Sequence, residues 1–284
     1  MMRTILVPID FSVPAYNAAL YALEMAKRLQ AALHLFHVIE AVDKALLDAQ
    51  IIWPIVNYDD LKAKAVDNIH LFQQRLEEHE ARNIGSNKVF ITCSLAEGVV
   101  HQEIDKEIHR SMPILLVAGM HGAGNARRFI FGSKSRDLIA HVYCPILLIP
   151  NDFTYRTIHK IAFATDLSQG DIDLIELLTV FAKPFDAEIL IGHIGADTDD
   201  TRHEETMETF LHAVTCKNND DKIYYRYIPQ KNIENGILWL TENGQIDVLT
   251  MVHRPRGILN ELLRGSRTKQ IAKRIAIPLL VLKH

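Results

Sequence analysis

Glycine and hydroxyl side chains follow the fourth apolar run of the chain at a spacing that suits a polyphosphate. Gly119 and Gly122 come directly after the run at 114–118, and Gly132 and Ser133 stand at the expected start of the next helix. Because glycine has no Cβ, backbone N–H groups in such a loop can approach an anion closely. A helix N-terminus adds further N–H donors and the positive end of the helix dipole. We therefore interpret residues 119–135 as a phosphate-binding segment.

This loop differs from the two commonest nucleotide-binding motifs. The chain contains no GxxxxGK[ST] sequence, and its glycine pair follows the fourth apolar run, whereas a dinucleotide-binding fingerprint follows the first. Ser133 lacks the GxSxG context of a hydrolase nucleophile, and no cysteine has a histidine partner by motif. We expect no catalytic residues, and therefore slow hydrolysis of a bound polyphosphate at most.

The elements that position this loop occur twice along the chain. At a constant offset of 156 residues, the matching pairs are Asp10 with Asp166, Ser12 with Ser168 and His37 with His193. Near the ends of the two copies the offset falls to 133, where Gly132-Ser133 match Gly265-Ser266 and Pro145 matches Pro278. A duplication of this length indicates two domains of one fold. We expect them at residues 1–150 and 157–284.

Each copy alternates short β-rich apolar runs with longer segments of helical periodicity, which is typical of βα units around a parallel sheet. The strands expected in the first copy are 4–8, 33–38, 88–92, 114–118 and 146–149, and those in the second are 160–165, 188–194, 223–228, 248–252 and 279–283. The segment at 42–57 has no counterpart in the second copy. Because this segment is apolar, it covers core or an interface in one interpretation and forms a lid over a ligand in the other.

Composition narrows the possible partners and the compartment. The formal net charge of −4 gives no basic footprint for nucleic acid or for an anionic membrane surface. The cysteines Cys93, Cys144 and Cys216 are isolated and odd in number, which argues against a disulfide framework. No apolar run approaches the length of a membrane span. We expect a cytoplasmic protein without nucleic-acid or membrane partners.

The spacing GxxGx9GS resembles the ATP-binding signature of the universal stress protein family, here in a tandem form. The early strand end at Val7–Asp10 and the closing run that follows Cys144 and Pro145 fit the same family. The resemblance covers nearly the whole chain. It implies two Rossmann-like α/β domains of the adenine nucleotide alpha hydrolase-like type, each with a five-stranded parallel sheet of order 3-2-1-4-5 and helices on both faces. It also implies that the last strands of the two domains pair antiparallel, so that the tandem chain imitates a homodimer of single domains. A homodimer of two such chains is a further possibility that the sequence does not decide.

The resemblance also implies a nucleotide site in the first copy, for ATP, ADP or AMP with Mg²⁺. Asp10 would lie near the ribose or a metal-bound phosphate, which makes it an indirect metal ligand, and the backbone of Val38 would meet the adenine. The residues expected to bind nucleotide are Pro8, Ile9, Asp10, Val38, Gly119, Met120, His121, Gly122, Gly132, Ser133, Lys134 and Ser135. Lys134 and His121 are equally consistent with a solvated loop.

The second copy departs from this signature. Val252 stands where the first copy has Gly119, and Pro255 stands where it has Gly122. Proline has no N–H and a fixed φ, so it cannot supply the backbone donor of a phosphate loop. We expect the second nucleotide site to be lost, unless Gly257 restores the turn. Gly265 and Ser266 still open a helix that could hold a smaller anion.

Other polar residues have structural interpretations. His37 and His193 occupy equivalent strand ends, where hydrogen-bonded scaffold roles are favoured over ligand contacts. Asp10 and Asp166 have the side chain of a helix cap, a role that Ser12 or Ser168 can share. For Asp166 we favour the capping role, because its phosphate loop is missing.

These observations favour an ATP-binding regulatory protein of the stress response, with its nucleotide in the N-terminal domain. A scaffold that binds no nucleotide and presents an interaction surface is an alternative. A weak ATPase is a third possibility, against which the absence of a catalytic base speaks.

Overall fold

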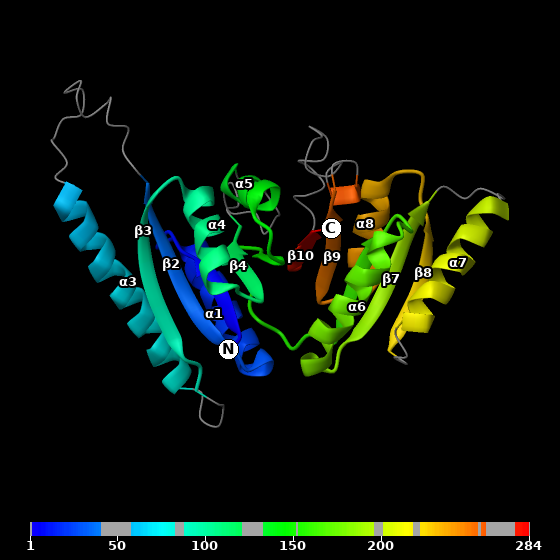
Figure 1. Cartoon of the computed structure of the whole chain (residues 1–284). Helices are drawn as coiled ribbons and strands as arrows, with labels where there is room; N and C mark the ends of the chain where they lie inside the picture. The colour runs from blue at the N-terminus through cyan, green and yellow to red at the C-terminus, as the bar shows by residue number, and fades with distance from the viewer. Residues whose placement is uncertain are drawn as a thin grey trace, which may run out of the picture. The chain divides into compact units, whose positions relative to one another are not determined.

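The computed structural model describes residues 2–40, 58–82, 88–120, 133–151, 153–195, 201–217, 222–254, 257–259 and 276–283. At residues 58, 133–134 and 201–204 it describes the backbone alone. The chain divides into two compact units (Figure 1), Met1–Gly119 with Ser133–Cys144 and Met120–Gly132 with Pro145–His284. Each unit is described by itself.

The first unit holds four parallel strands in the order β3-β2-β1-β4. Their bounds are β1 Thr4–Pro8, β2 Ala32–Glu40, β3 Ile91–Gly98 and β4 Leu115–Gly119. The central strands β1 and β4 are apolar because helices cover both sides of the sheet. All four strands end at the same edge, so the residues that follow them lie close together.

Side chains of β2 point alternately to the two faces of this sheet, and their contacts show which helix covers each face. The helices are α1 Val13–Leu29, α3 Tyr58–Ala81, α4 Val100–Ser111 and α5 Ser133–His141. His34 lies 3.5 Å from Glu107 of α4, whereas the ring of His37 contacts Phe11, which in turn contacts Phe72 of α3. Because side chains three apart in a strand point to opposite faces, α4 covers one face and α3 the other. Figure 1 shows α4 in front of the strands.

The second unit contains six strands in the order β5-β10-β9-β6-β7-β8. Their bounds are β5 Ile146–Ile149, β6 Lys160–Thr165, β7 Glu188–Gly195, β8 Ile223–Pro229, β9 Val248–His253 and β10 Leu279–Lys283. The second copy therefore has the expected order 3-2-1-4-5. Strands β5 and β10 pair antiparallel, with Leu147 opposite Leu280, which confirms the expected pairing of the two last strands.

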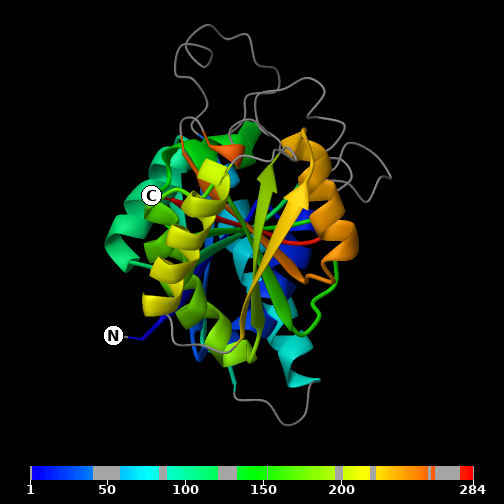
Figure 2. The same ribbon diagram turned by 90° about the vertical axis from the view of Figure 1, so that its right-hand side faces the viewer.

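Among the described residues of this unit, α-helices and one 3₁₀ turn accompany these strands. They are α6 Gly170–Ala182, η1 Lys183–Phe185, α7 Thr201–Lys217 and α8 Ile233–Asn243. Figure 2 views this unit from its outer strands, with α7 in yellow on one side of β7 and β8 and α8 in orange on the other. The α/β fold with helices on both faces is thus the one expected from the sequence.

One strand lies elsewhere than the sequence pattern predicts. We expected the third strand at 88–92, and it runs from Ile91 to Gly98. β3 borders only β2 and most of its residues are half-exposed, so its second part lacks the apolar run by which the other strands are recognised. The segment 42–57 and the helix expected at 266–275 lie outside the described residues.

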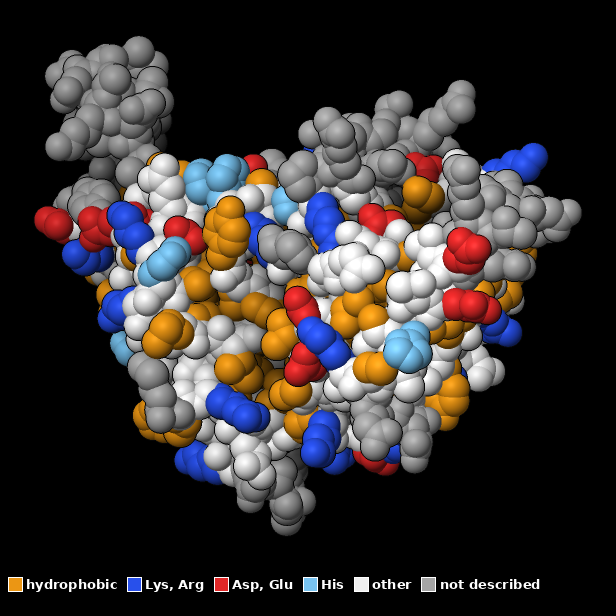
Figure 3. Space-filling view, turned by 45° about the vertical axis from the view of Figure 1, so that its right-hand side comes forward, with side chains coloured by type: hydrophobic (Ala, Val, Ile, Leu, Met, Phe, Trp, Pro, Cys, Tyr) orange, Lys and Arg blue, Asp and Glu red, His pale blue; other side chains and the backbone are white. Residues whose placement is uncertain are grey.

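In the described part of the chain, no helix has the length and apolarity needed to cross a membrane. Acidic and basic side chains are interspersed over the face of the molecule in Figure 3, in keeping with the formal net charge of −4. The cysteines Cys93, Cys144 and Cys216 are all free thiols.

Candidate functional site

The turn after β1 brings a carboxylate to the positive end of α1. Asp10 Oδ1 accepts hydrogen bonds from the backbone N–H of Ser12 at 3.1 Å and from its hydroxyl at 2.5 Å. Ser12 Oγ in turn accepts from the N–H of Ala15 at 3.3 Å and so caps the helix. Phe11 between them adopts a φ of 61°, a conformation that non-glycine residues rarely take and that is enriched at functional sites. Asp10 is thus oriented by the cap while its side chain stays exposed.

Gly119 ends β4 directly against the first turn of α1. A Cβ at this position would lie 2.4 Å from the carbonyl oxygen of Pro14 and 2.7 Å from its carbonyl carbon. Backbone atoms cannot move aside as a side chain can, so glycine is required here by packing. The carboxyl end of β4 therefore lies beside the N-terminus of α1. This packing requirement is a second reason for the glycine, besides the approach of an anion.

Ile9 and His37 fix the neighbouring strand ends to one another. The N–H of Ile9 donates to the carbonyl of Phe36 at 2.9 Å, and Nδ1 of His37 donates to the carbonyl of Ile9 at 2.7 Å. The scaffold role expected for His37 is confirmed. The pairing register of β1 with β2 ends at Pro8 and Phe36. The backbone groups of successive residues in β2 point alternately toward β1 and toward β3, and Val38 is the next residue after Phe36 that faces β1. The N–H and carbonyl groups of Val38 therefore lie past the end of β1.

Two further expected residues are buried beside the glycine loop. Met120 is 1% exposed, and its N–H donates to the carbonyl of Ile149 at 2.9 Å. That N–H is therefore used inside the protein, and Met120 can border a ligand only through its other atoms. Ser135 lies in the first turn of α5 and is 6% exposed.

The remaining expected positions have no described side chains. The backbone of Ser133 and Lys134 opens α5, as predicted. His121, Gly122 and Gly132 lie outside the described residues, as do the positions of the second copy at Pro255, Gly265 and Ser266.

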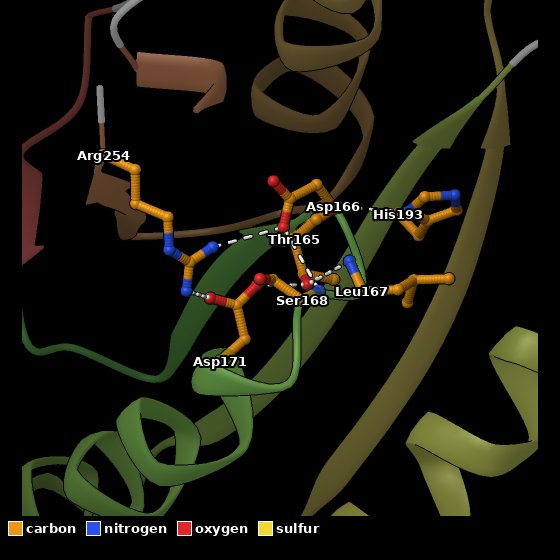
Figure 4. Close-up of polar contacts among 7 residues, drawn as sticks. All are labelled: Thr165, Asp166, Leu167, Ser168, Asp171, His193 and Arg254. Carbon is orange, nitrogen blue, oxygen red and sulfur yellow. Dashed lines mark hydrogen bonds and ion pairs between the residues drawn. The ribbon is translucent and has the colours of Figure 1, made fainter. Parts of the chain in front are cut away.

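The equivalent strand end of the second unit is occupied by an arginine. Arg254 follows β9 and reaches over the turn between β6 and α6, where it pairs with Asp166 at 3.2 Å and with Asp171 (Figure 4). The hydroxyl of Thr165 donates to the other oxygen of Asp171 at 2.6 Å and accepts from the N–H of Leu167 at 2.8 Å. One guanidinium thus links the segments on either side of this strand end.

The network supplies hydrogen bonds to the carboxylate of Asp171, which is almost completely buried. Asp171 is 1% exposed, and burial raises its pKa, an effect that its hydrogen bonds from Thr165 and Arg254 oppose. A buried charge of this kind is tolerated only when it is paired and hydrogen-bonded. The side chain of Arg254 is itself only 18% exposed. The arginine is therefore an integral part of this strand end.

The turn itself is the same in both halves. Leu167 has a φ of 61°, as Phe11 has in the first half, and the N–H of Ser168 donates to Asp166 at 3.2 Å. His193 donates to the carbonyl of Thr165 at 3.0 Å, which confirms its expected scaffold role.

The capping role that we favoured for Asp166 is wrong. The N-cap of α6 is Gln169, and no side chain caps this helix. Asp166 instead pairs with Arg254, because a cation stands within reach. Gly257 also does not offer a free donor, since its N–H donates to the carbonyl of Arg254 at 3.2 Å.

Sequence reasoning missed this network, although the repeat carries a signal for it. The second copy replaces the residues equivalent to Ile9, Ala15 and His121 by Thr165, Asp171 and Arg254. Each change adds a hydrogen-bonding or charged group at one strand end, and together the three form a satisfied set. A search for acidic and basic residues that appear together in one copy but not in the other would have indicated this network.

A metal site receives no support from the described residues, among which no group of three or more His, Cys, Asp or Glu side chains could hold an ion. The stacked pair His101 and His141, with ring centroids 4.7 Å apart, has no third ligand in that part of the chain.

Comparisons with known proteins agree with the fold. The model of the universal stress protein family matches residues 1–150. A universal stress protein of Methanocaldococcus jannaschii is 24% identical over 149 residues, which cover 52% of this chain and 82% of that protein. The crystal structure of a universal stress protein from Archaeoglobus fulgidus superposes with a TM-score of 0.72 at 18% identity, covering 99% of this chain and 98% of the other. A functionally unknown protein from Pseudomonas aeruginosa gives a TM-score of 0.62 at 19% identity, covering 99% of this chain and 92% of its own. The chain belongs to the universal stress protein family.

Proposed function

We propose that this chain binds one adenine nucleotide, with ATP as the leading candidate and Mg²⁺ as its counterion, at the strand ends of the first half. As a universal stress protein it has a role in the stress response. In this proposal the nucleotide is the signal that the chain reads, with the N-terminal domain at 1–150 carrying the site and the domain at 157–284 carrying none. A cytoplasmic location and a homodimer belong to the same proposal.

The arrangement of backbone groups at the first strand edge supports a nucleoside. The polar groups of Val38 that face β1 lie beyond the last β1 pair, which leaves them in the position to meet the edge of an adenine. Asp10, fixed by Ser12, is placed for a ribose hydroxyl or a metal-bound phosphate. The helices α1 and α5 both begin at this edge, and helix N-termini favour anions.

The contrast with the second half is the single observation that carries the proposal. There the same turn is closed by Arg254 through Asp166 and Asp171. The first half has Ala15 and His121 at the positions of Asp171 and Arg254, and it cannot build that network. One half has thus filled its strand end with its own side chains, while the other keeps a glycine loop there.

The residues of the site bind and orient, and none is placed for chemistry. Asp10 holds the ribose or the metal, the Val38 backbone selects the base, and the start of α5 with Ser135 receives the phosphates. In this proposal turnover is slow, and occupancy of the site is the signal.

Matched substitutions at the two strand ends test this proposal. Asp10→Asn keeps the shape of the side chain and removes its charge, and Asp166→Asn makes the same change in the second half. Hydrogen bonds to charged groups contribute about 1.5–3 kcal/mol, so Asp10→Asn should weaken Mg·ATP binding about tenfold or more. Asp166→Asn should leave it unchanged. Equal losses in the two variants, or none in Asp10→Asn, would show that the nucleotide does not bind at the first strand end.

A further inference from the structure

A cavity of the first unit lies on the face of the sheet that α4 covers. It has a volume of about 310 Å³, near the lower limit of small-molecule sites. Phe36 of β2 and Ser94 and Ala96 of β3 line it on the sheet side, and Glu107 and Arg110 line it on the helix side. None of these residues belongs to the proposed nucleotide site.

The cavity contains a buried carboxylate with an unsatisfied oxygen. Glu107 is only 5% exposed. Its Oε2 accepts from Nε and Nη2 of Arg110 at 2.8 and 2.7 Å, whereas its Oε1 has no hydrogen-bond partner. Nearly all buried polar atoms in proteins are hydrogen-bonded, so an orphaned carboxylate oxygen indicates a donor that the chain itself does not supply.

His34 is the nearest side chain to this oxygen, with its Nε2 at 3.5 Å, but it cannot supply the proton. Its Nδ1 lies 2.8 Å from the hydroxyl of Thr92 and its Nε2 lies 2.9 Å from the hydroxyl of Ser94. Thr92 donates its own proton to the carbonyl of Leu33 at 3.4 Å, so Nδ1 donates to Thr92 and Nε2 accepts from Ser94. With this arrangement of hydrogen bonds the Nε2 atom carries no proton for Glu107.

The second half of the chain has aliphatic residues at the equivalent position. At the offsets of the repeat, Glu107 corresponds to Leu240, His34 to Leu190 and Phe36 to Gly192. Leu240 is fully buried, and one of its methyl carbons would lie 3.0 Å from a Cβ on Gly192. The position is closed by aliphatic packing there. In the first half it carries charge and empty volume instead.

The rim of the cavity carries cations beside an apolar wall. Arg110 and Lys106 are both about 70% exposed, and Lys106 pairs with Glu103 at 2.7 Å. Phe36 and Ala96 supply apolar surface between the rim and Glu107. The lining therefore combines a buried acceptor, an apolar wall and an exposed cationic edge.

We propose that this cavity binds a small zwitterion of the α-amino-acid type with an aliphatic side chain. Its ammonium group donates to Oε1 of Glu107, its carboxylate lies at the rim with Arg110 and Lys106, and its side chain packs on Phe36 and Ala96. The site is independent of the nucleotide site, and its ligand is a second signal for the same protein.

The test uses L-leucine as the probe with the whole chain, observed through the backbone amide shifts of β3 and α4. Leucine should give saturable shifts around Ser94 and Ala96. 3-Methylbutylamine lacks the carboxylate and 4-methylpentanoate lacks the amine, so each should bind at least about tenfold more weakly, the factor that one lost charged contact produces. Absence of binding by leucine, or binding no tighter than that of the amine, would overturn the proposal.

Two variants separate binding from folding. Glu107→Leu copies the second half, and replacing a buried charge by a packed aliphatic side chain is often neutral or stabilising. It should abolish leucine binding while the unfolding midpoint stays equal or rises. Ala96→Leu fills the cavity without a change of charge and should also abolish binding. Retained leucine binding in either variant, or a lower midpoint in Glu107→Leu with binding intact, would show that Glu107 is a structural residue. Titration with Mg·ATP, which reports the other site, should be unaffected in both.

Discussion

Removal of Arg254 should destabilise the second half of the chain specifically. Arg254→Ala leaves Asp171 buried without its cation, and it leaves Asp166 without its partner at 3.2 Å. Breaking a buried ion pair by deletion of one partner costs about 3–5 kcal/mol. The hydroxyl of Thr165 still donates to Asp171 in the variant, and Arg254 is 18% exposed, so we expect the lower end, about 3 kcal/mol.

The assay needs a probe that reports the second half alone, because a two-domain chain does not unfold in one step. The chain has two tryptophans, of which Trp239 lies on α8. In a Trp53→Phe background, Trp239 fluorescence during urea unfolding reports the second half. Its midpoint should fall in Arg254→Ala while hydrogen exchange in β1 and β2 is unchanged.

A double-mutant cycle decides whether the loss comes from the pair. Asp171→Ala gives the second half the residue that the first half has at Ala15. In Arg254→Ala/Asp171→Ala no carboxylate is left buried and unpaired at position 171, so the double variant should be more stable than Arg254→Ala by about 1.5 kcal/mol or more. Additive losses, or a loss under about 0.5 kcal/mol for Arg254→Ala, would refute the reasoning.

The effect should also depend on pH with a definite sign. Burial raises the pKa of Asp171 in the folded chain, so the folded state binds this proton more tightly than the unfolded state does. Stability from this group therefore falls as pH rises from the ordinary carboxyl pKa through the raised one. Without Arg254 the folded pKa rises further. The destabilisation by Arg254→Ala should consequently be largest at neutral pH and shrink as the solution is acidified.

Further predictions concern the first half and the thiols. Gly119→Ala should lower the stability of the first half by about 1–3 kcal/mol without any ligand, since its Cβ meets backbone of α1, whereas Gly192→Ala meets only a side-chain methyl and should cost less in the same urea titration. Burial lowers the pKa of His34, so on acidification the unfolded chain binds a proton at this imidazole before the folded chain does. The first half should therefore lose stability as pH falls below the ordinary histidine pKa of 6.5. His34→Leu should reduce this dependence of stability on pH, measured by hydrogen exchange of β2. Burial raises the pKa of the Cys144 thiol to about 12, so Ellman's reagent at pH 8 should modify the exposed Cys216 quickly and Cys144 only after denaturation.

Much of the fold could be predicted because the chain repeats itself. The apolar runs at β1, β5, β6 and β10 are bounded as the sequence indicates, since strands buried on both faces leave a continuous apolar signal. β3 was displaced, because its position is set by pairing with β2 rather than by its own composition. Pairing across 58 residues, as between His34 and Thr92, has no local signature.

The roles of site residues could be predicted where equivalent positions of the two copies hold the same residue type. The histidines at 37 and 193 hold strand ends in both halves, as expected from their equivalent positions. The close approach of an anion explained the glycine at position 119 only in part. The contact of Gly119 with Pro14 depends on how α1 packs on β4, which the sequence does not show. The pairing of Arg254 with Asp171 was not predicted because 83 residues separate them, and only the fold shows that their charges meet.

The number of nucleotides bound per chain tests the central claim most directly. Calorimetric titration of the whole chain with Mg·ATP measures affinity and stoichiometry together. The account predicts one site, which Gly122→Pro abolishes by copying the proline of the second half and which Arg254→Ala leaves intact. Two sites per chain would contradict the closure of the second strand end by Arg254, and no binding by the unaltered chain would contradict the nucleotide site altogether.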